Sequence, residues 1–124
     1  DGTLPLPPGV NVPGYTSKAA AAGETLVIYS IGFGQTNPPV QTGAASPSSP
    51  LAQLANVVVQ FGVPDLLGSA LVRTPASFAG LTPNFVGLFQ INVQIPSNVR
   101  SAPDLDVTID YNGQISNRAK IATR

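Results

Sequence analysis

The sequence predicts an all-β protein, an antiparallel β-sandwich of about seven strands with a long loop after the first core strand. Three observations lead to this fold class. The chain has 124 residues, which is the size of one domain. Short segments rich in β-branched and aromatic residues alternate apolar with polar side chains, and Gly, Pro and Asn separate them. No longer segment shows the apolar period of an amphipathic helix.

Residues 1–22 are rich in Pro, Gly and Ala, and we predict an N-terminal arm or edge strand there, ahead of a sandwich domain over residues 23–124. The prolines cannot donate backbone hydrogen bonds to a sheet, which limits pairing. The candidate contacts of the arm are its alternating apolar residues Leu4, Leu6, Val10 and Val12. An arm of this composition becomes ordered only when something holds it. We expect it to pack on the chain's own sandwich, and the alternative is a groove in a neighbouring copy.

The strands are predicted, in order, over residues 24–31, 56–63, 69–74, 88–95, 104–111 and 114–122. The first strand is followed by a loop over residues 32–50. Structureless loops of this length are uncommon in compact domains and are usually functional or mobile. Residues 79–87 are predicted to form a tight turn between strands.

Alternation along these strands predicts which side chains face the core. We expect burial of Val27, Tyr29, Val57, Val59, Phe61, Phe89, Ile91, Val93, Leu105, Val107 and Ile109. The polar side of the strand at 88–95 carries an amide stripe of Gln90, Asn92 and Gln94. Polar residues usually face solvent, so we expect a solvent face or a face that the loop at 32–50 covers. The alternative is a surface that binds carbohydrate or another strand.

The last hairpin is predicted to have a three-residue loop of Tyr111, Asn112 and Gly113, with Gly113 in the left-handed conformation. A two-residue type I′ turn at Asn112 and Gly113 would place apolar residues opposite polar ones, against the usual control of register by the buried face. The three-residue loop instead pairs Ile109 with Ile115, Val107 with Asn117, Leu105 with Ala119, Asp106 with Arg118 and Asp104 with Lys120.

The composition excludes several classes of site. The chain has no His and no Cys. A Ser-His-Asp triad, a cysteine nucleophile or a zinc site therefore cannot be built from this chain alone. We expect no enzymatic activity, and no catalytic, cofactor-binding or metal-binding residue. The net charge of zero argues against binding to nucleic acid, and no apolar stretch approaches the roughly 20 residues of a membrane span.

Asp104, Asp106 and Asp110 lie on one face of a predicted strand. Carboxylates two residues apart on a strand start about 6.6–7 Å apart, whereas Ca²⁺ needs roughly six to eight converging oxygens. We expect a solvated face, and the alternative is a weak calcium contact through Asp104 and Asp106.

Three motifs carry a family resemblance. The first consists of Gly32, Gly34, Pro38, Pro39 and Gly43, and the second of Gly62, Val63 and Pro64, with Phe61 where the family usually has Gly. The third consists of Ala79, Gly80, Leu81, Pro83, Phe85, Gly87, Gln90, Asn92, Val93 and Pro96. Over residues 24–122 the chain resembles the C-terminal β-sandwich domain of secreted acidobacterial proteins, the Solibacter-type domain. The stretch between Pro64 and Ala79 is longer here than in that family.

The resemblance implies an immunoglobulin-like, exported module, and no catalysis, because the family has no assigned activity. We therefore expect a non-catalytic module of an exported bacterial protein that serves structure, attachment or protein–protein contact. Because the chain begins at Asp1 and contains no Met, we expect a signal peptide to have been removed. The partner is then a protein, either a second copy or other domains of a parent protein.

Two alternatives stay open. One is a self-assembling subunit of an extracellular fibre or pilus, a homopolymer in which the N-terminal arm donates a strand to the next subunit. The more remote one is a carbohydrate-binding module, for which a chain with no Trp and only 3 Tyr is poorly equipped.

Overall fold

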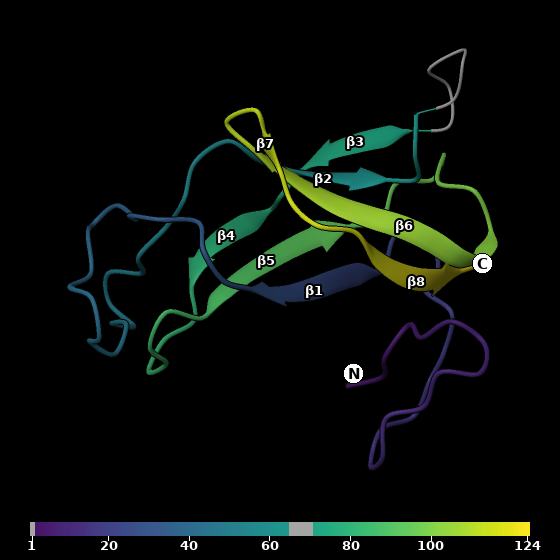
Figure 1. Cartoon of the computed structure of the whole chain (residues 1–124), viewed down its shortest axis with the longest axis horizontal. Helices are drawn as coiled ribbons and strands as arrows, with labels where there is room; N and C mark the ends of the chain where they lie inside the picture. Colours follow the sequence, from purple (N-terminus) through teal and green to yellow (C-terminus); the bar gives the residue numbers. More distant parts are fainter. Residues whose placement is uncertain (1, 65–70) are drawn as a thin grey trace.

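The structure is a computed structural model that describes residues 2–64 and 71–124. All regular elements among these residues are strands, and they form two antiparallel sheets (Figure 1). The strands are β1 (Thr25–Ser30), β2 (Val57–Phe61), β3 (Val72–Pro75), β4 (Phe78–Leu81), β5 (Phe89–Gln94), β6 (Ala102–Tyr111), β7 (Gln114–Ile115) and β8 (Ala119–Thr123). The predicted all-β sandwich is therefore confirmed, with eight strands in place of about seven.

The first sheet contains β1, β5 and β4 in that order. Val27 of β1 lies opposite Asn92 of β5, and Tyr29 lies opposite Gln90. On the other side of β5, Gly80 of β4 also lies opposite Gln90. β5 is thus the central strand, and its amide side chains lie between β1 and β4.

A loop segment continues this sheet beyond β4. The N–H of Leu81 donates to the carbonyl of Ala52, and the N–H of Leu54 donates to that of Ala79, both at 2.8 Å. This close approach requires a glycine, because a Cβ on Gly80 would overlap the carbonyl oxygen of Ala52. The edge of β4 is therefore covered by the chain's own loop.

The second sheet has the order β3-β2-β6, and β6 pairs along its other side with β7 and then with β8. β6 is ten residues long, which lets it pair with both of these strands. Figure 1 shows β6 crossing above β5 and β1, so the two sheets form the two layers of the sandwich.

The core lies between the two sheets. The predicted core residues of β2, β5 and β6 are all buried: Val57, Val59, Phe61, Phe89, Ile91, Val93, Leu105, Val107 and Ile109. Phe33, just after β1, contacts Phe89 and Tyr111 edge-on, with ring centroids 5.1 and 5.6 Å apart. The start of the long loop therefore packs against both sheets.

The core prediction is wrong for β1. Val27 is 44% exposed and Tyr29 is 60% exposed, whereas Leu26 is buried and Ile28 is half-buried. Four consecutive apolar side chains occupy residues 26–29, so alternation does not say which pair faces inward. The observed choice places two aliphatic side chains in the core and leaves the Tyr29 hydroxyl in contact with water, as aromatic residues with a polar group prefer.

The predicted three-residue loop of the last hairpin is also wrong. Tyr111 pairs with Gln114 across a two-residue turn. Asn112 and Gly113 both have positive φ, 52° and 85°, which is the conformation of a type I′ turn. Ile115 therefore lies opposite Asp110 and not opposite Ile109.

The apolar pairing that this turn disturbs is restored further along. The register shifts by one residue between β7 and β8, so that Val107 lies opposite Ala119 and Leu105 lies opposite Ile121. Lys120 consequently faces Asp106, where Arg118 was expected. One extra residue between β7 and β8 thus restores the apolar pairing that the three-residue loop was predicted to provide.

The middle of the chain differs from the prediction as well. The third strand was expected over 69–74, of which 69 and 70 lie outside the described residues, and it runs over Val72–Pro75. The tight turn expected at 79–87 begins later, because Phe78–Leu81 is β4. Ala79 and Leu81 are buried, so apolar contacts to the core hold this segment in the sheet.

The long loop after β1 is attached at two places. Asn37 and Gln53 exchange backbone hydrogen bonds of 2.9 and 3.1 Å. Ser46 receives a hydrogen bond from the N–H of Asn84 (2.9 Å) and donates its own N–H to the carbonyl of Phe85 (3.0 Å). The loop thus follows the edge of β4 and the turn beyond it.

The N-terminal arm is held on β8 at its base. Ala122 of β8 donates its N–H to the carbonyl of Pro5 (2.8 Å) and accepts a hydrogen bond from the N–H of Ala20 (2.9 Å). Within the arm, Leu4 forms a parallel bridge with Ser17. The intervening residues extend past β8, away from the two sheets (Figure 1).

Candidate functional site

The three strands of the first sheet contain no charged residue. Their sequences are TLVIYS for β1, FAGL for β4 and FQINVQ for β5. The connecting segments share this property, since residues 25–64 and 74–99 include no Asp, Glu, Lys or Arg. We call this sheet, with the loop segments attached to it, the uncharged sheet.

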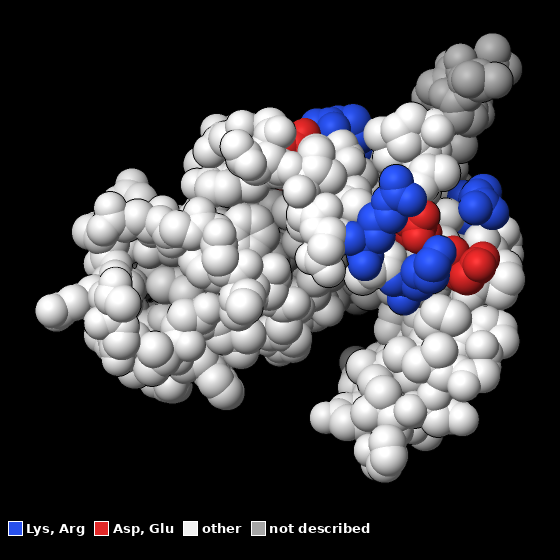
Figure 2. Space-filling view, in the orientation of Figure 1, with Lys and Arg blue, Asp and Glu red and all other residues white. Residues whose placement is uncertain are grey.

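Glu24 directly precedes β1, and all other described charged residues lie on the other sheet or in the segments beside it. These others are Lys18, Arg73, Arg100, Asp104, Asp106, Asp110, Arg118, Lys120 and Arg124. In Figure 2 the blue and red side chains gather around β8, with a smaller group near β3, and the part over the long loop is white. The molecule therefore has one charged and one uncharged half.

β1 is an open edge strand of the uncharged sheet. Its single partner is β5, and no backbone hydrogen bond from the rest of the described chain reaches β1. In an antiparallel pair, alternate residues direct their N–H and C=O groups away from the partner strand. Exposed edges of this kind are usually protected by Lys, Pro or a bulge, and β1 has none of these.

An apolar groove of about 320 Å³ lies beside this open edge. It runs between β1 and the returning segment that contains β7 and β8. Leu26, Ile28, Val107, Ile109 and Ile121 line it, with Ser116 and Asn117 on the side opposite β1 and Pro5 of the arm also at its surface. The groove combines unpaired backbone groups with an apolar surface, which are the two requirements for binding an extended segment.

Exposed apolar side chains lie along the outer face of the same edge. Val27 and Tyr29 point outward from β1, and Ile31, just beyond the strand, is 78% exposed. Phe85 and Val86, in the turn after β4, are also exposed. Cores of protein interfaces are depleted of charge and enriched in aromatic residues, and the uncharged sheet has both properties.

The predicted amide stripe lies on the outer face of the uncharged sheet, but its members already hydrogen-bond within the chain. The Nε2 of Gln90 donates to the Oδ1 of Asn92 (2.9 Å), and the Nε2 of Gln94 donates to the carbonyl of Gly23 (3.1 Å). Gln90 and Asn92 are half-buried and Gln94 is exposed. The stripe sits beside Val27 and Tyr29 as a polar border of the exposed apolar residues.

The predicted arm contacts separate into two groups. Leu4 and Leu6 are half-buried at the base of the arm. Val10 and Val12 are 47% and 38% exposed, so the expectation that they pack on the chain's own sandwich is wrong for these two. The N–H of Val10 donates to the carbonyl of Pro7, and the N–H of Tyr15 donates to that of Val12, both at 3.1 Å. These two turns bend the arm, so Val10 and Val12 do not reach the sheets.

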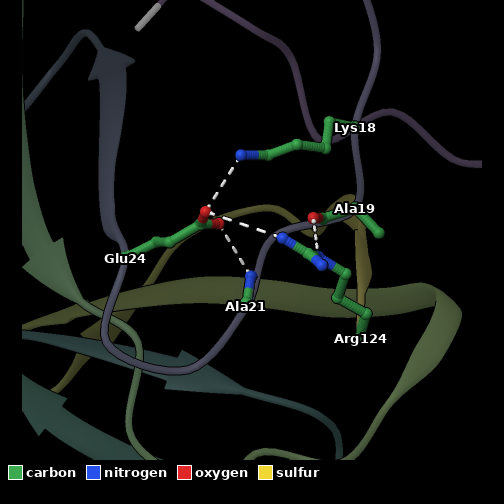
Figure 3. A network of polar contacts seen from close by, with 5 residues as sticks. All are labelled: Lys18, Ala19, Ala21, Glu24 and Arg124. Atoms are coloured by element: carbon green, nitrogen blue, oxygen red, sulfur yellow. Dashed lines mark hydrogen bonds and ion pairs between the residues drawn. The ribbon is translucent and has the colours of Figure 1, made fainter.

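Glu24 joins the arm to the sandwich through its carboxylate (Figure 3). Its Oε2 accepts the N–H of Ala21 (2.8 Å), and its Oε1 lies 3.0 Å from the Nζ of Lys18 and 4.0 Å from Arg124. The Nε of Arg124 also donates to the carbonyl of Ala19 (3.1 Å). The hydrogen bond from Ala21, followed by the contact with Lys18, lowers the pKa of Glu24.

Two aspartates of β6, Asp106 and Asp110, take part in ion pairs. Asp106 contacts Lys120 at 2.8 Å and Arg118 at 3.9 Å, and Asp110 contacts Arg73 at 2.9 Å. The hydrogen bond from Lys120 lowers the pKa of Asp106. In the part of the chain that the structure describes, no three His, Cys, Asp or Glu side chains form a group that could hold a metal ion. These aspartates therefore connect strands of the charged sheet.

Sequence reasoning missed the site at β1, because it placed Val27 and Tyr29 in the core. A signal for the site was present in the two long runs without a charged residue, at 25–64 and 74–99. β1 comes from the first run and β4 and β5 come from the second, and these three strands form one sheet, which the sequence alone does not reveal. The described residues contain no helix long and apolar enough to cross a membrane. Comparison of the chain with family models, curated proteins and solved structures gives no match.

Proposed function

We propose that this chain is a non-catalytic contact module of an exported bacterial protein, and that it binds another protein along the uncharged sheet and its open edge β1. The observation that carries the proposal is the apolar groove beside an unprotected edge strand. Natural sheets rarely leave such an edge exposed, because it pairs with other chains. We therefore expect an edge strand that lacks charged residues, Pro and a bulge to pair with a binding partner.

The chemistry of the chain supports a binding role over a catalytic one. Without His and Cys, acid–base work would fall to carboxylates. Glu24, Asp106 and Asp110 are each bound to basic side chains, and the pKa values of Glu24 and Asp106 are lowered, which favours their charged forms. The lining of the groove is mainly aliphatic, with Tyr29, Ser30, Ser116 and Asn117 as its polar members, and it includes no carboxylate.

The resemblance to the Solibacter-type domain supports the export of the protein and its placement at the cell surface or outside the cell. The motifs of that family at 79–96 correspond here to β4, the following turn and β5. Contact with other domains of a parent protein, or with a second copy, suits such a module.

The proposal is tested by photo-crosslinking in the bacterium that makes the protein. A photoreactive phenylalanine analogue replaces Tyr29 in the full-length protein, and a matched variant carries it in place of Asp104, which is exposed on the charged sheet. We expect a protein adduct from position 29 and none from position 104. Adding Val27→Lys should abolish the adduct, because a lysine protects an edge strand from pairing.

The opposite results would contradict the proposal. If position 29 gave no adduct, or if both positions gave the same adducts, the uncharged sheet would not be the contact surface. Purified wild type and Val27→Lys should have the same denaturation midpoint in urea, since Val27 is exposed, and this equality shows that the added lysine acts on contact and not on folding.

A further inference from the structure

We propose that the groove beside β1 receives the tip of the N-terminal arm of a second copy, so that copies of this chain associate head to tail. The arm tip is defined as residues 8–15, which are all exposed. This inference rests on the proposed function and names its partner.

The arm tip has the character of a segment that binds elsewhere. It contains no charged residue, and it exposes Val10, Val12 and Tyr15, the last by 58%. An isolated apolar residue on a surface needs no explanation, but a grouped set marks an interaction site. The set here lies on a segment that projects beyond the sandwich (Figure 1).

The tip cannot enter the groove of its own chain. Both ends of the arm are bound to the same residue of β8, through Ala122 N–H to Pro5 O and Ala20 N–H to Ala122 O. The bridge between Leu4 and Ser17 then closes the segment into a loop that points away from the sheets. The tip is therefore available to a neighbouring molecule.

The groove fits a single segment better than a whole sheet. The returning segment, with Ser116 and Asn117, faces β1 across the groove, so a second sandwich pairing edge to edge with β1 would meet this side. Arg118 and Lys120 alternate along the chain with the groove residues Asn117, Ala119 and Ile121, so basic side chains lie close to the groove. An uncharged tip brings no basic side chain to them and therefore meets no repulsion there.

The groove beside β1 and the arm tip also match in size and in apolar character. A groove of about 320 Å³ has room for a few aliphatic side chains, and the tip carries Val10 and Val12 two residues apart, a spacing that puts them on the same face of an extended segment. The prolines of the arm limit hydrogen bonding to β1, so apolar contact supplies most of the affinity. We therefore expect weak, concentration-dependent association.

The tip and the groove are different surfaces, so their contact is heterologous and continues from copy to copy. This property gives a sharp test with two full-length variants. The tip variant carries Val10→Asp and Val12→Asp. The groove variant carries Val27→Lys and Tyr29→Lys, two residues of β1 that also line the groove. All four positions are exposed, and urea denaturation of each variant checks that the fold is kept.

The measurement is the mass in solution by light scattering or sedimentation. We expect the wild type to exceed the 12.7 kDa of one chain increasingly as its concentration rises. Each variant alone should remain at the mass of one chain. An equal mixture of the two should form a dimer of twice that mass and nothing larger, because the tip variant still has a groove and the groove variant still has a tip.

Three results would overturn the inference. If the wild type stayed at one chain's mass at every concentration, there would be no self-association, and a crosslink from position 29 to a different protein would leave the proposed function intact. If the tip variant associated like the wild type while the groove variant did not, β1 would pair with something other than the tip. If the mixture stayed monomeric, the contact would not be head to tail.

Discussion

The carboxylate of Glu24 lies where the arm enters the sandwich, and we predict that its titration can be followed at Ala21. Its pKa is lowered below the usual value of 4.5, first by the N–H of Ala21 and then by Lys18. A lowered folded pKa means that this contribution to stability is fully present above pH 4.5 and is lost as the pH falls through the folded value. Acidification should therefore loosen the base of the arm.

The measurement is the pH dependence of the Ala21 amide resonance in an NMR titration. We expect a midpoint below 4.5, because this amide hydrogen-bonds directly to the carboxylate. Glu24→Gln is the matched control, since it keeps an acceptor but does not titrate, and its Ala21 resonance should stay constant over the same range. A midpoint at or above 4.5 would show that the contacts do not stabilise the charged form.

At the residue scale, the sequence predicts the core wherever apolar and polar side chains alternate strictly. In β5 the polar residues Gln90, Asn92 and Gln94 leave one choice of buried face, and that choice is confirmed. In β1 both faces are apolar, so the choice depends on which side chains fit between the sheets. That fit depends on tertiary packing, which a local pattern does not contain.

The β6–β7 hairpin depends on its turn, and we predict that Gly113→Ala destabilises the protein. Gly113 has a φ of 85°, and an alanine in a left-handed conformation costs about 1–2 kcal/mol. Asn112→Gly is the matched variant, because glycine accepts the positive φ of 52° at that position and should change stability little. Urea denaturation measures both, with the midpoint shifting and the slope unchanged.

Equal effects of the two variants, or no effect of Gly113→Ala, would contradict this account of the turn. The hairpin also illustrates how far an element can be predicted from sequence. Asn112 and Gly113 are the preferred pair for a two-residue turn, but the apolar pattern of the strands favoured a longer loop. The chain satisfies both with a register shift between β7 and β8, and such irregularities have no clear signature in a single sequence.

At the scale of the whole molecule, the candidate site arises from topology. The two uncharged runs at 25–64 and 74–99 are separated in sequence, but β1, β5 and β4 join them in one sheet. The arm was expected to pack on its own sandwich through Leu4, Leu6, Val10 and Val12, and it is held there at its base, where Pro5 accepts a hydrogen bond from Ala122 of β8. The exposure of its tip follows from the turns at Val10 and Tyr15, whose orientation the proline-rich sequence does not specify.

The base and the tip of the arm should have different roles, and deletion of residues 1–14 tests the base. The deletion removes the hydrogen bond from Ala122 to Pro5 and both hydrogen bonds of Leu4, with Thr16 and Lys18. Hydrogen bonds contribute about 0.5–1.5 kcal/mol each, so the loss of these three should lower the free energy of unfolding by roughly 1.5–4.5 kcal/mol. The deletion also removes all of the tip except Tyr15, including Val10 and Val12, so it should abolish self-association at the same time.

Comparison with the tip variant, Val10→Asp with Val12→Asp, separates the two effects. That variant keeps every hydrogen bond at the base, so it should lose self-association while its urea midpoint, measured at low protein concentration, stays at the wild-type value. A deletion that left the midpoint unchanged would mean that the base adds nothing to the fold of the monomer. The arm would then serve contact alone, and β8 would hold its place through β6 without help from Pro5.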